Sequence, residues 1–176
     1  AIKNPDIKKA ADKGLANAFD LIGNCYYLKG DYPAALLYHF KALDIRNTIQ
    51  DKKGIARSLN NIGVVYKGQG EYAKALEYYF KALKINKEFM NKNRIAANLG
   101  NIGTVYHLQA EYTKALECYF KALKIYEELG DKYGIASNLI CIGIVYKYQG
   151  EFTKALEYYF KGLKILEELG NKYSIA

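Results

Sequence analysis

Residues 59–85 read LNNIGVVYKGQGEYAKALEYYFKALKI, and this stretch decides the fold. Its first half repeats apolar residues at spacings of three and four, as in Leu59, Ile62 and Tyr66, which is the period of an amphipathic helix. The second half does the same from Tyr72 onward. Because only the tripeptide QGE separates the two halves, the two predicted helices must lie antiparallel as a hairpin.

Gly63 stands inside the first of these helices, although a glycine in a helix interior costs about 1 kcal/mol relative to alanine. The same glycine recurs at intervals of 40 residues as Gly23, Gly103 and Gly143. A residue without a side chain lets another helix approach closely. We therefore expect the second helix to pack against Gly63 near Ala75, with large side chains filling the space around the contact.

Four blocks of 40 residues align without a gap, and the second and fourth are identical at more than half of their positions. One hairpin cannot bury its apolar face alone, whereas stacked hairpins share a continuous core. We therefore predict an all-α chain, a right-handed α-solenoid of stacked antiparallel helix hairpins. The predicted divisions are 1–13 as an N-terminal cap or the end of a preceding repeat, 14–53, 54–93, 94–133 and 134–173 as repeats 1 to 4, and 174–176 as the start of a further repeat.

Glycines and short polar residues mark the predicted helix ends. A left-handed residue would end each first helix at Gly30, Gly70 and Gly150, with Ala110 in their place in the third block. Second helices are predicted to stop at Gly130 and Gly170. N-caps are expected at Asp51, Asn91, Asp131 and Asn171, and Asn4-Pro5 resembles a further helix start.

The composition is that of an ordered protein, with 51% hydrophobic residues and two prolines. No apolar run reaches the roughly 18 residues that a membrane helix needs, and the first residues lack a signal core. Three cysteines without a C-x-x-C pair predict neither a disulfide framework nor a zinc site, which favours a reducing compartment, the cytoplasm. The net charge of +8 would attract an acidic peptide, nucleic acid or an anionic membrane.

The residue order within each block resembles the tetratricopeptide repeat (TPR). The matching positions of the second block are Leu59, Ile62, Gly63, Tyr66, Gly70, Tyr72, Ala75, Tyr79 and Ala82. Leu59 stands where the family often has tryptophan, the closing proline is absent, and the period is longer than the usual length of about 34 residues. The chain is therefore similar to the long-repeat branch found in cell-polarity adaptors and bacterial signalling proteins.

The resemblance implies a TPR superhelix that binds proteins or peptides and is not an enzyme, without cofactor or metal. The sequence agrees with the expectation that the chain is not an enzyme. A repeat places the same side chains in every block, whereas an active site needs a set of residues that occurs only once. His39 stands where the other blocks have tyrosine, and we interpret it as a packed core residue. Cys25 and Cys141 lie in first helices without a histidine at the same level to activate them.

In the TPR family the first helices line the concave groove, so the positions at which the first helices differ most are the expected peptide-binding groove. They are Asn24, Tyr27, Arg57, Asn60, Asn61, Lys67, Asn101, Thr104, His107, Lys147 and Tyr148, with Asn17, Asp20 and Val64 on the same variable face. Asparagine both donates and accepts hydrogen bonds, so these side chains could bracket the backbone of an extended peptide. Basic groove residues outnumber Asp20, which favours an acidic ligand.

Three functions remain open. The leading hypothesis is a protein-interaction scaffold that holds a peptide or protein segment in its groove. The second is a regulatory or sensor module that controls an attached output domain in a bacterial signalling protein. An RNA-binding helical repeat is disfavoured, because it would require a stripe of unpaired basic residues. Lysines of the second helices such as Lys81 instead follow a glutamate by four residues, and such pairs form a solvent-exposed convex surface. No membrane partner is expected, and the uncapped fourth hairpin predicts end-to-end self-association.

Overall fold

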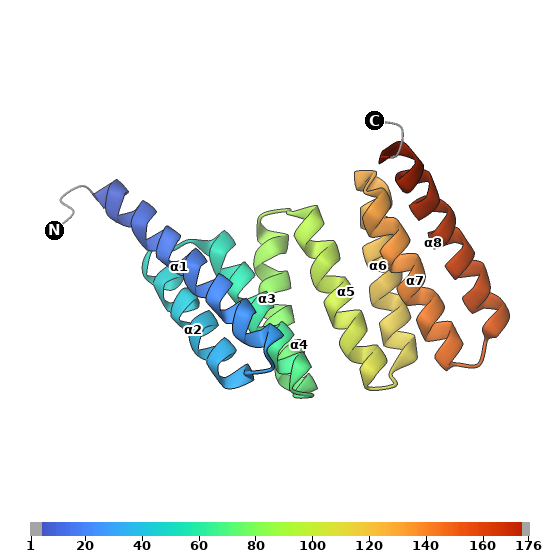
Figure 1. The fold of residues 1–176 in the computed structure, drawn as a ribbon, viewed down its shortest axis with the longest axis horizontal. Helices are drawn as coiled ribbons and strands as arrows, with labels where there is room; N and C mark the ends of the chain where they lie inside the picture. The colour runs from blue at the N-terminus through green and yellow to red at the C-terminus, as the bar shows by residue number, and fades with distance from the viewer. Residues whose placement is uncertain (1–4, 174–176) are drawn as a thin grey trace. The chain divides into compact units, whose positions relative to one another are not determined.

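The structure is a computed structural model that describes residues 5–173, and the side chains of residues 5–170. Within this range the regular elements are all helices (Figure 1). They are α1 (Pro5–Leu28), α2 (Tyr32–Thr48), α3 (Lys52–Gly68), α4 (Tyr72–Glu88), α5 (Lys92–Leu108), α6 (Tyr112–Leu129), α7 (Lys132–Tyr148) and α8 (Phe152–Tyr173). The predicted all-α class, built of antiparallel helix pairs, is confirmed. Residues 5–13 are the first turns of α1, which runs unbroken through Gly14.

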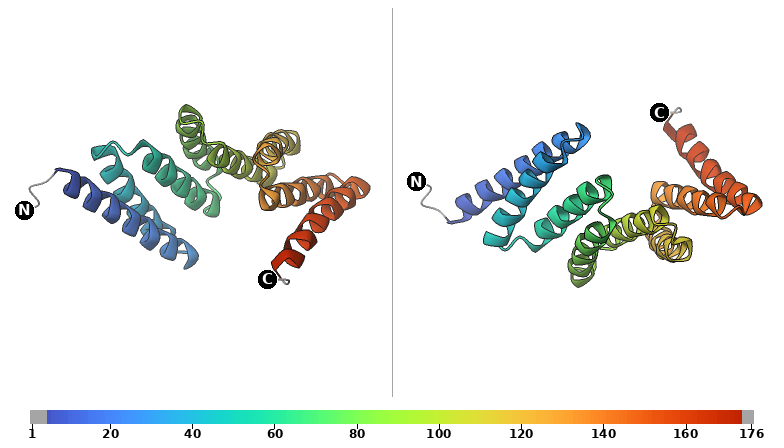
Figure 2. Two further views of the ribbon diagram at one scale, coloured as in Figure 1. Left: turned by 90° about the horizontal axis from the view of Figure 1, so that it is seen from above. Right: turned by 90° about the horizontal axis from the view of Figure 1, so that it is seen from below.

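The chain divides into two compact units, Ala1–Phe89 and Met90–Ala176. In the first unit, α1 and α2 form one hairpin and α3 and α4 a second, and α3 packs against both helices of the first hairpin (Figure 2). The second unit repeats this arrangement, with α7 in contact with both α5 and α6. Because consecutive helices reverse direction, α1 and α3 run the same way, as do α5 and α7. No helix within residues 5–173 is long and apolar enough to cross a membrane.

Short polar side chains begin the first helices as predicted. The Asp51 carboxylate accepts a hydrogen bond from the backbone amide of Gly54 at 3.1 Å. Asn91 and Asp131 cap α5 and α7 in the same way, at 3.2 Å and 3.0 Å. Each cap satisfies one of the amides that the first turn of a helix leaves without an intrahelical partner.

The predicted end of the last helix is wrong. Helix α8 continues through Gly170 to Tyr173, so Gly170 does not stop it and Asn171 lies in the helix instead of capping a new one. An interior glycine costs only about 1 kcal/mol, and it ends a helix only where the chain also turns. At the other end α1 begins at Pro5 as expected, while Asn4 lies outside the described residues.

The hairpin turns each place one residue in the left-handed conformation, as the glycine pattern predicts. Gly30, Gly70 and Gly150 have φ values of 78°, 78° and 80°, and Ala110 adopts a φ of 59° at the same place. Glycine takes this conformation without steric cost, whereas the Cβ atom of any other residue crowds the following carbonyl oxygen.

Replacing Ala110 by glycine should therefore stabilise the protein. Removing the left-handed strain should gain about 1 kcal/mol, part of which the greater freedom of glycine in the unfolded chain offsets. Urea unfolding followed by circular dichroism measures the change. Gly70→Ala is the matched control with the opposite sign, because no atom lies within 4 Å of a Cβ built there and only the backbone conformation resists it. An unchanged or lowered midpoint for Ala110→Gly would contradict the strain argument.

The four recurring glycines lie where two helices meet, as predicted. A Cβ atom built on Gly63 would lie 2.7 Å from Cε1 of Tyr79, a distance that real Cβ atoms essentially never show. The equivalent distances are 2.8 Å from Gly23 to His39, 3.0 Å from Gly103 to Tyr119 and 2.7 Å from Gly143 to Tyr159. The ring of Tyr79, one turn beyond Ala75, fills the space that Gly63 leaves.

Tyrosine rings also pack within hairpins and between neighbouring ones. Tyr78 of α4 stacks on Tyr66 of α3 with ring centroids 5.4 Å apart, and Phe40 of α2 meets it edge-on at 6.2 Å. Tyr158 makes the equivalent contacts in the second unit, with Tyr146 and Phe120 at 5.5 Å and 6.2 Å. Such aromatic pairs add stability beyond the area they bury. These tyrosines therefore serve packing, which is the role their helical spacing indicates.

Candidate functional site

The first unit contains a cavity between its two first helices. Its volume is about 350 Å³, near the lower limit of small ligand sites. Apolar and polar side chains share the lining, which consists of Asn24, Tyr27, Leu28, His39, Asn61, Val64 and Val65. Helix α1 supplies the first three, α2 supplies His39, and α3 supplies the rest. Mixed walls of this kind can enclose an apolar side chain while the two asparagines bond to the peptide backbone beside it.

Four residues predicted for the variable groove face therefore meet at this cavity: Asn24, Tyr27, Asn61 and Val64. Tyr27 owes its position to a glycine that the sequence analysis did not single out. A Cβ on Gly68 would lie 2.9 Å from Cε2 of Tyr27, and the Tyr27 ring also packs on Tyr32 with centroids 5.9 Å apart. The absent side chain of Gly68 thus lets the Tyr27 ring lie against α3.

A buried polar cluster adjoins the cavity and shares His39 with it. We call it the Asp20 network, formed by Asn17, Asp20, His39, Arg46, Arg57 and Ser58. The Asp20 carboxylate accepts hydrogen bonds from His39 Nδ1 at 2.9 Å and from Arg46 Nη1 at 2.5 Å. Because a carboxylate can only accept, the Nδ1 atom of His39 carries the proton. Arg46 also donates to the Ser58 hydroxyl and, at 3.0 Å, to the Asn17 carbonyl oxygen.

Two of these residues depart from the sequence interpretation. Asp20 was expected on the groove surface, but only 5% of it is exposed, because Arg46 and His39 reach it from α2. Arg46 was not singled out and is fully buried. The sequence did contain a signal for Arg46, because it departs from the repeat: the other blocks have Asn86, Tyr126 and Leu166 at the same position. His39 is packed in the core as expected, at 1% exposure.

The electrostatic state of the network follows from these bonds. Burial alone would raise the pKa of Asp20, but the hydrogen bonds from His39 and Arg46 and the charge of Arg46 outweigh it, so the pKa is lowered. Asp20 is therefore ionised at neutral pH and balances the buried guanidinium of Arg46. Buried charges persist only when they are paired in this way.

The second unit has a different arrangement at the positions equivalent to Tyr27 and Gly68. His107 stands in place of Tyr27, and Tyr148 in place of Gly68. The His107 and Tyr148 rings meet edge-on at 4.9 Å, and the Lys147 ammonium lies 4.9 Å from the Tyr148 ring centre. Burial and the charge of Lys147 lower the pKa of His107, so it is neutral at pH 7. Three predicted groove residues, His107, Lys147 and Tyr148, are thus brought together.

The remaining predicted groove residues are partly buried. The Thr104 hydroxyl donates to the carbonyl of Gly100 at 3.0 Å and lies 3.1 Å from the Tyr119 hydroxyl. Its hydrogen bonds are therefore made within the protein. Asn60 and Asn101 are half-buried and also interact with other residues. Lys67 is half-buried as well, and this burial lowers its pKa. An anion beside Lys67 would favour its charged form.

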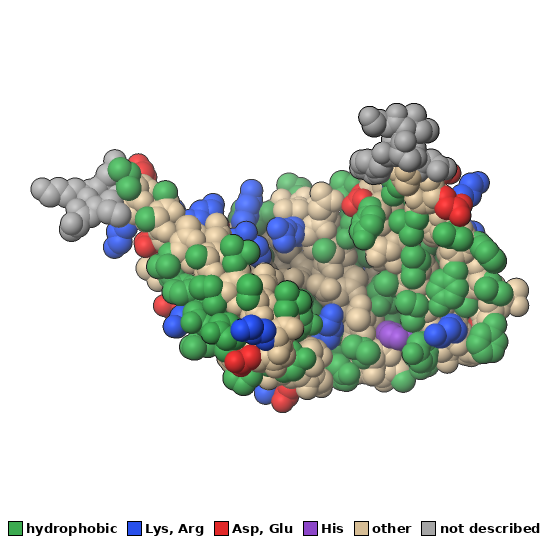
Figure 3. All heavy atoms as spheres, in the orientation of Figure 1, with side chains coloured by type: hydrophobic (Ala, Val, Ile, Leu, Met, Phe, Trp, Pro, Cys, Tyr) green, Lys and Arg blue, Asp and Glu red, His purple; other side chains and the backbone are tan. Residues whose placement is uncertain are grey.

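Positive charge is concentrated on the first helices. Helix α3 has four basic residues, α5 has two and α7 has two, while these three helices contain no aspartate or glutamate. Two of the eight, Lys92 and Lys132, form ion pairs with Glu128 and Glu168. Blue side chains gather near the start of α3 in Figure 3. The second helices instead carry compensating pairs, such as Lys81 with Glu77 at 2.5 Å and Lys161 with Glu157 at 2.6 Å.

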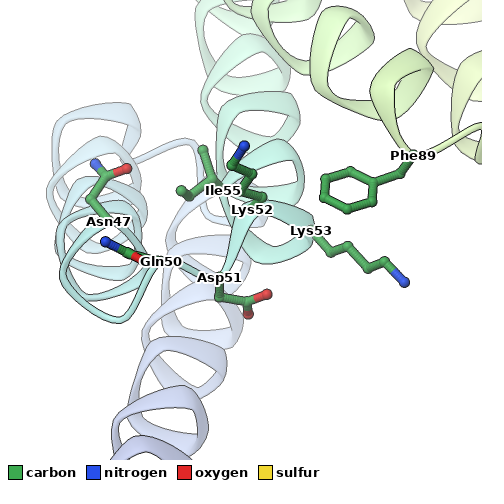
Figure 4. A pocket seen from close by; sticks show the side chains of 7 residues that line it. All are labelled: Asn47, Gln50, Asp51, Lys52, Lys53, Ile55 and Phe89. Carbon is green, nitrogen blue, oxygen red and sulfur yellow. The ribbon is translucent and has the colours of Figure 1, made fainter.

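A second cavity of about 600 Å³ lies in the first unit at the turn between α2 and α3. Figure 4 shows Phe89, from the end of α4, extending toward the start of α3, where Lys52, Lys53 and Ile55 line the other wall. The Lys53 ammonium lies 5.7 Å from the Phe89 ring centre. Of the residues predicted for the groove, none lines this cavity, so we assign the candidate site to the smaller cavity between α1 and α3.

A family model for the tetratricopeptide repeat matches residues 14–88 and 94–168. The chain therefore belongs to the tetratricopeptide-repeat family. Each match covers two consecutive hairpins, and together they include the cavity, the Asp20 network and the His107 contacts. The resemblance drawn from the spacing around Gly63 is confirmed.

Solved structures share the fold. The apo form of RapI superposes with a TM-score of 0.80 at 27% identity, covering 98% of this chain and 61% of RapI. Aspartyl phosphate phosphatase F from Bacillus subtilis gives a TM-score of 0.84 at 19% identity, covering 90% of this chain and 42% of that protein. A Rap protein in complex with competence and sporulation factor gives 0.82 at 21%, covering 91% of this chain and 45% of that one. The chain thus spans between two fifths and two thirds of these proteins. No curated protein sequence matches it.

Proposed function

We propose that this chain is a protein-interaction scaffold that binds an extended, acidic peptide segment along the groove between the first helices α1 and α3. The observation that carries the proposal is the cavity of about 350 Å³ bordered by Asn24, Asn61 and Tyr27. A side chain of the ligand would enter the cavity, and the two asparagines would hydrogen-bond to the ligand backbone on either side. The same asparagines accept any sequence, so the cavity walls and the surrounding charge would provide the selectivity.

The preference for an acidic ligand is supported by the charge of α3. This helix carries Lys52, Lys53, Arg57 and Lys67 and no acidic residue. Asp20, the acidic residue expected on this face, is buried and already bonded to Arg46 and His39. The charged residues of α3 nearest the cavity, Arg57 and Lys67, are therefore both basic. Complementary charge would raise the association rate and orient the ligand.

The tetratricopeptide-repeat family match supports a binding role, and the solved structures favour a second candidate. A Rap protein of the same fold was solved in complex with competence and sporulation factor. RapI is longer than this chain, which covers 61% of it. A regulatory module that controls an attached output domain is therefore the alternative. A cytoplasmic location belongs to the same proposal, supported by the three free cysteines among the described residues.

The double variant Asn24→Asp/Asn61→Asp tests the proposal. The two carboxylates match the asparagines in shape but cannot donate, and they repel an acidic ligand, so affinity should fall by at least about tenfold. The measurement is fluorescence anisotropy with peptides enriched from a randomised 12-residue display library panned on the chain. Asn93→Asp, an exposed site on α5 of the second unit that does not line the cavity, should leave affinity unchanged. Unaltered binding by the double variant, with an intact circular dichroism spectrum, would sink the proposal.

We also propose that the isolated chain associates end to end through α8. Phe152, Leu156, Phe160 and Leu163 form an apolar stripe on this helix and are 47–64% exposed. In α6 the equivalent Leu116 packs against the core beneath the next hairpin, so a second copy would cover the stripe in the same manner. Light scattering should detect association that rises with concentration, and Leu156→Glu with Phe160→Glu should abolish it. Strictly monomeric behaviour of the unaltered chain would contradict this.

A further inference from the structure

Arg57 lies beside the candidate cavity in a fixed orientation. It shares one face of α3 with Asn61 and Val64, which follow it at helical spacings of four and seven residues. Its guanidinium Nη2 donates to the Asn17 carbonyl oxygen, and its Nε lies 3.6 Å from the Asp20 carboxylate. The side chain is nevertheless 38% exposed. The Arg57 side chain is therefore accessible to solvent while residues of α1 hold its guanidinium in place.

The Asp20 network that holds Arg57 carries more positive than negative charge. Its members include two arginines and a single carboxylate, that of Asp20, which His39 and Arg46 already contact at 2.9 Å and 2.5 Å. The Asn17 carbonyl oxygen accepts from both Arg46 and Arg57, so it links the two guanidiniums. A guanidinium fixed in this way loses little side-chain entropy when it binds a planar carboxylate, and its fork geometry matches that group.

We propose that Arg57 is an anchor for an acidic side chain of the bound peptide, two residues away along the peptide from the side chain that fills the cavity. The inference rests on the proposed function and specifies the sequence that the site selects. Four helical residues from Arg57 to Asn61 correspond to a rise of about 6 Å. An extended peptide advances about 3.3 Å per residue, so two peptide residues span the same distance. The selected motif is an acidic residue, any residue, then the cavity-filling residue, or the reverse order.

A carboxylate fits these surroundings better than a nucleic-acid phosphate. The two asparagines beside the cavity provide the donors and acceptors that an extended peptide backbone requires. Binding of single-stranded nucleic acid relies on exposed aromatic rings for base stacking. The aromatic ring beside the cavity, Tyr27, is half-buried and lies against Tyr32 and Gly68. We therefore favour a peptide carboxylate as the ligand of Arg57. Binding of a nucleic-acid phosphate is the alternative outcome of the test.

The test is a double-mutant cycle between protein and peptide. A randomised 12-residue peptide library is panned on the 176-residue chain, and the enriched sequences are examined for an acidic residue two positions from a common apolar residue. One enriched peptide and its Glu→Gln counterpart are then measured by anisotropy against the unaltered protein and Arg57→Gln. We expect the Glu→Gln peptide to bind about tenfold more weakly to the unaltered protein, and both peptides to bind Arg57→Gln equally.

Two control variants separate the role of the anchor from that of overall charge. Lys84→Gln removes one positive charge from an exposed position on α4 and should preserve the tenfold difference between the peptides. Arg57→Lys keeps the charge but loses the fork, so the difference should shrink without vanishing. Circular dichroism melting of each variant verifies that the fold is retained.

The outcomes distinguish the anchor from the scaffold itself. Enriched peptides that bind through the cavity residues but show no acidic residue at this spacing, or a Glu→Gln difference that persists in Arg57→Gln, would overturn the anchor and leave the scaffold function standing. A library without any binder that responds to Asn24→Asp/Asn61→Asp would overturn both. Displacement of the peptide by a 12-nucleotide single-stranded RNA that depends on Arg57 and binds more tightly would show that the position selects phosphate.

Discussion

Replacing Asp20 by alanine should lower the free energy of unfolding by about 3–5 kcal/mol, the largest effect expected of any single substitution in the Asp20 network. The reason is the environment of Arg46, which is fully buried and donates to Asp20 at 2.5 Å. Without the carboxylate, a guanidinium remains in the interior with its charge unbalanced. His39 loses its hydrogen-bond acceptor in the same step. Guanidinium chloride unfolding followed by circular dichroism measures the loss.

Two control variants identify the charge as the cause. Asp44→Ala removes an exposed carboxylate from α2 and should change stability by less than about 0.5 kcal/mol. Asp20→Asn keeps a hydrogen-bond acceptor of similar shape, so it should cost less than Asp20→Ala. Hydrogen exchange should place the increased opening in α1, α2 and α3, the helices that the network joins. If Asp20→Ala matched Asp44→Ala, Arg46 would have to be solvated, and the network would not be a structural element.

The same carboxylate predicts a pH dependence. The pKa of Asp20 is lowered in the folded state, because the hydrogen bonds from His39 and Arg46 outweigh the opposing effect of burial. A group with a depressed folded pKa contributes its full stability above the unfolded value, about 3.9, and loses it as the pH falls toward the folded value. The stability of the unaltered protein should therefore decrease below about pH 4. Asp20→Asn should show a shallower decrease, since the group that titrates is gone.

Gly63→Ala should destabilise the protein by about 1–3 kcal/mol, although alanine is the better helix former. The added methyl group would lie 2.7 Å from the Tyr79 ring, and that ring is fully buried and cannot move aside without displacing its own neighbours. The expected gain of about 1 kcal/mol in helix propensity is smaller than the cost of this overpacking. The thermal midpoint and the urea midpoint should both fall.

Gly14→Ala is the matched control, because it makes the same chemical change in the same unit. Gly14 lies within α1, and no atom lies within 4 Å of a Cβ built there. The substitution should therefore stabilise the protein by up to about 1 kcal/mol. Opposite signs for the two substitutions would establish close helix packing as the reason for Gly63. Stabilisation by both would show that the helices can separate slightly at no cost.

Features that every hairpin must share were predictable from the sequence. The glycine at Gly63 and its equivalents, the polar caps at Asp51 and Asp131, and the left-handed turn at Gly70 each recur because one physical requirement recurs. Gly170 was mispredicted for a related reason. The glycine is present at the repeated position, but the turn that makes Gly130 a helix end does not follow it within the described residues.

The Asp20 network was not predictable, because it depends on contacts between three helices. Spacing along α1 places Asp20 on the variable face, and nothing in that spacing indicates that Arg46 approaches from α2. Arg46 in turn needs the space that Gly54 leaves, since a Cβ there would lie 2.6 Å from its Cδ atom. Of the residues that line the cavity, Asn24, Tyr27, Asn61 and Val64 were marked in the sequence by variation on a first helix. His39 and Val65 were not, since each lies at a position that the other blocks use for packing. Leu28 was also missed, although Tyr148, its equivalent in the fourth block, was marked.

The Asp20 network also has a consequence for engineering the array. The four blocks look like interchangeable modules, and a designer would be tempted to excise or shuffle them at the 40-residue boundaries. Arg46 belongs to the first block by sequence, but the side chains that complete its surroundings include Ser58 from the second. Cutting between these blocks would take Ser58 away from the Arg46 guanidinium, which would lose part of its buried surroundings. The smallest piece that can be transplanted at this end therefore extends from α1 to the end of α4.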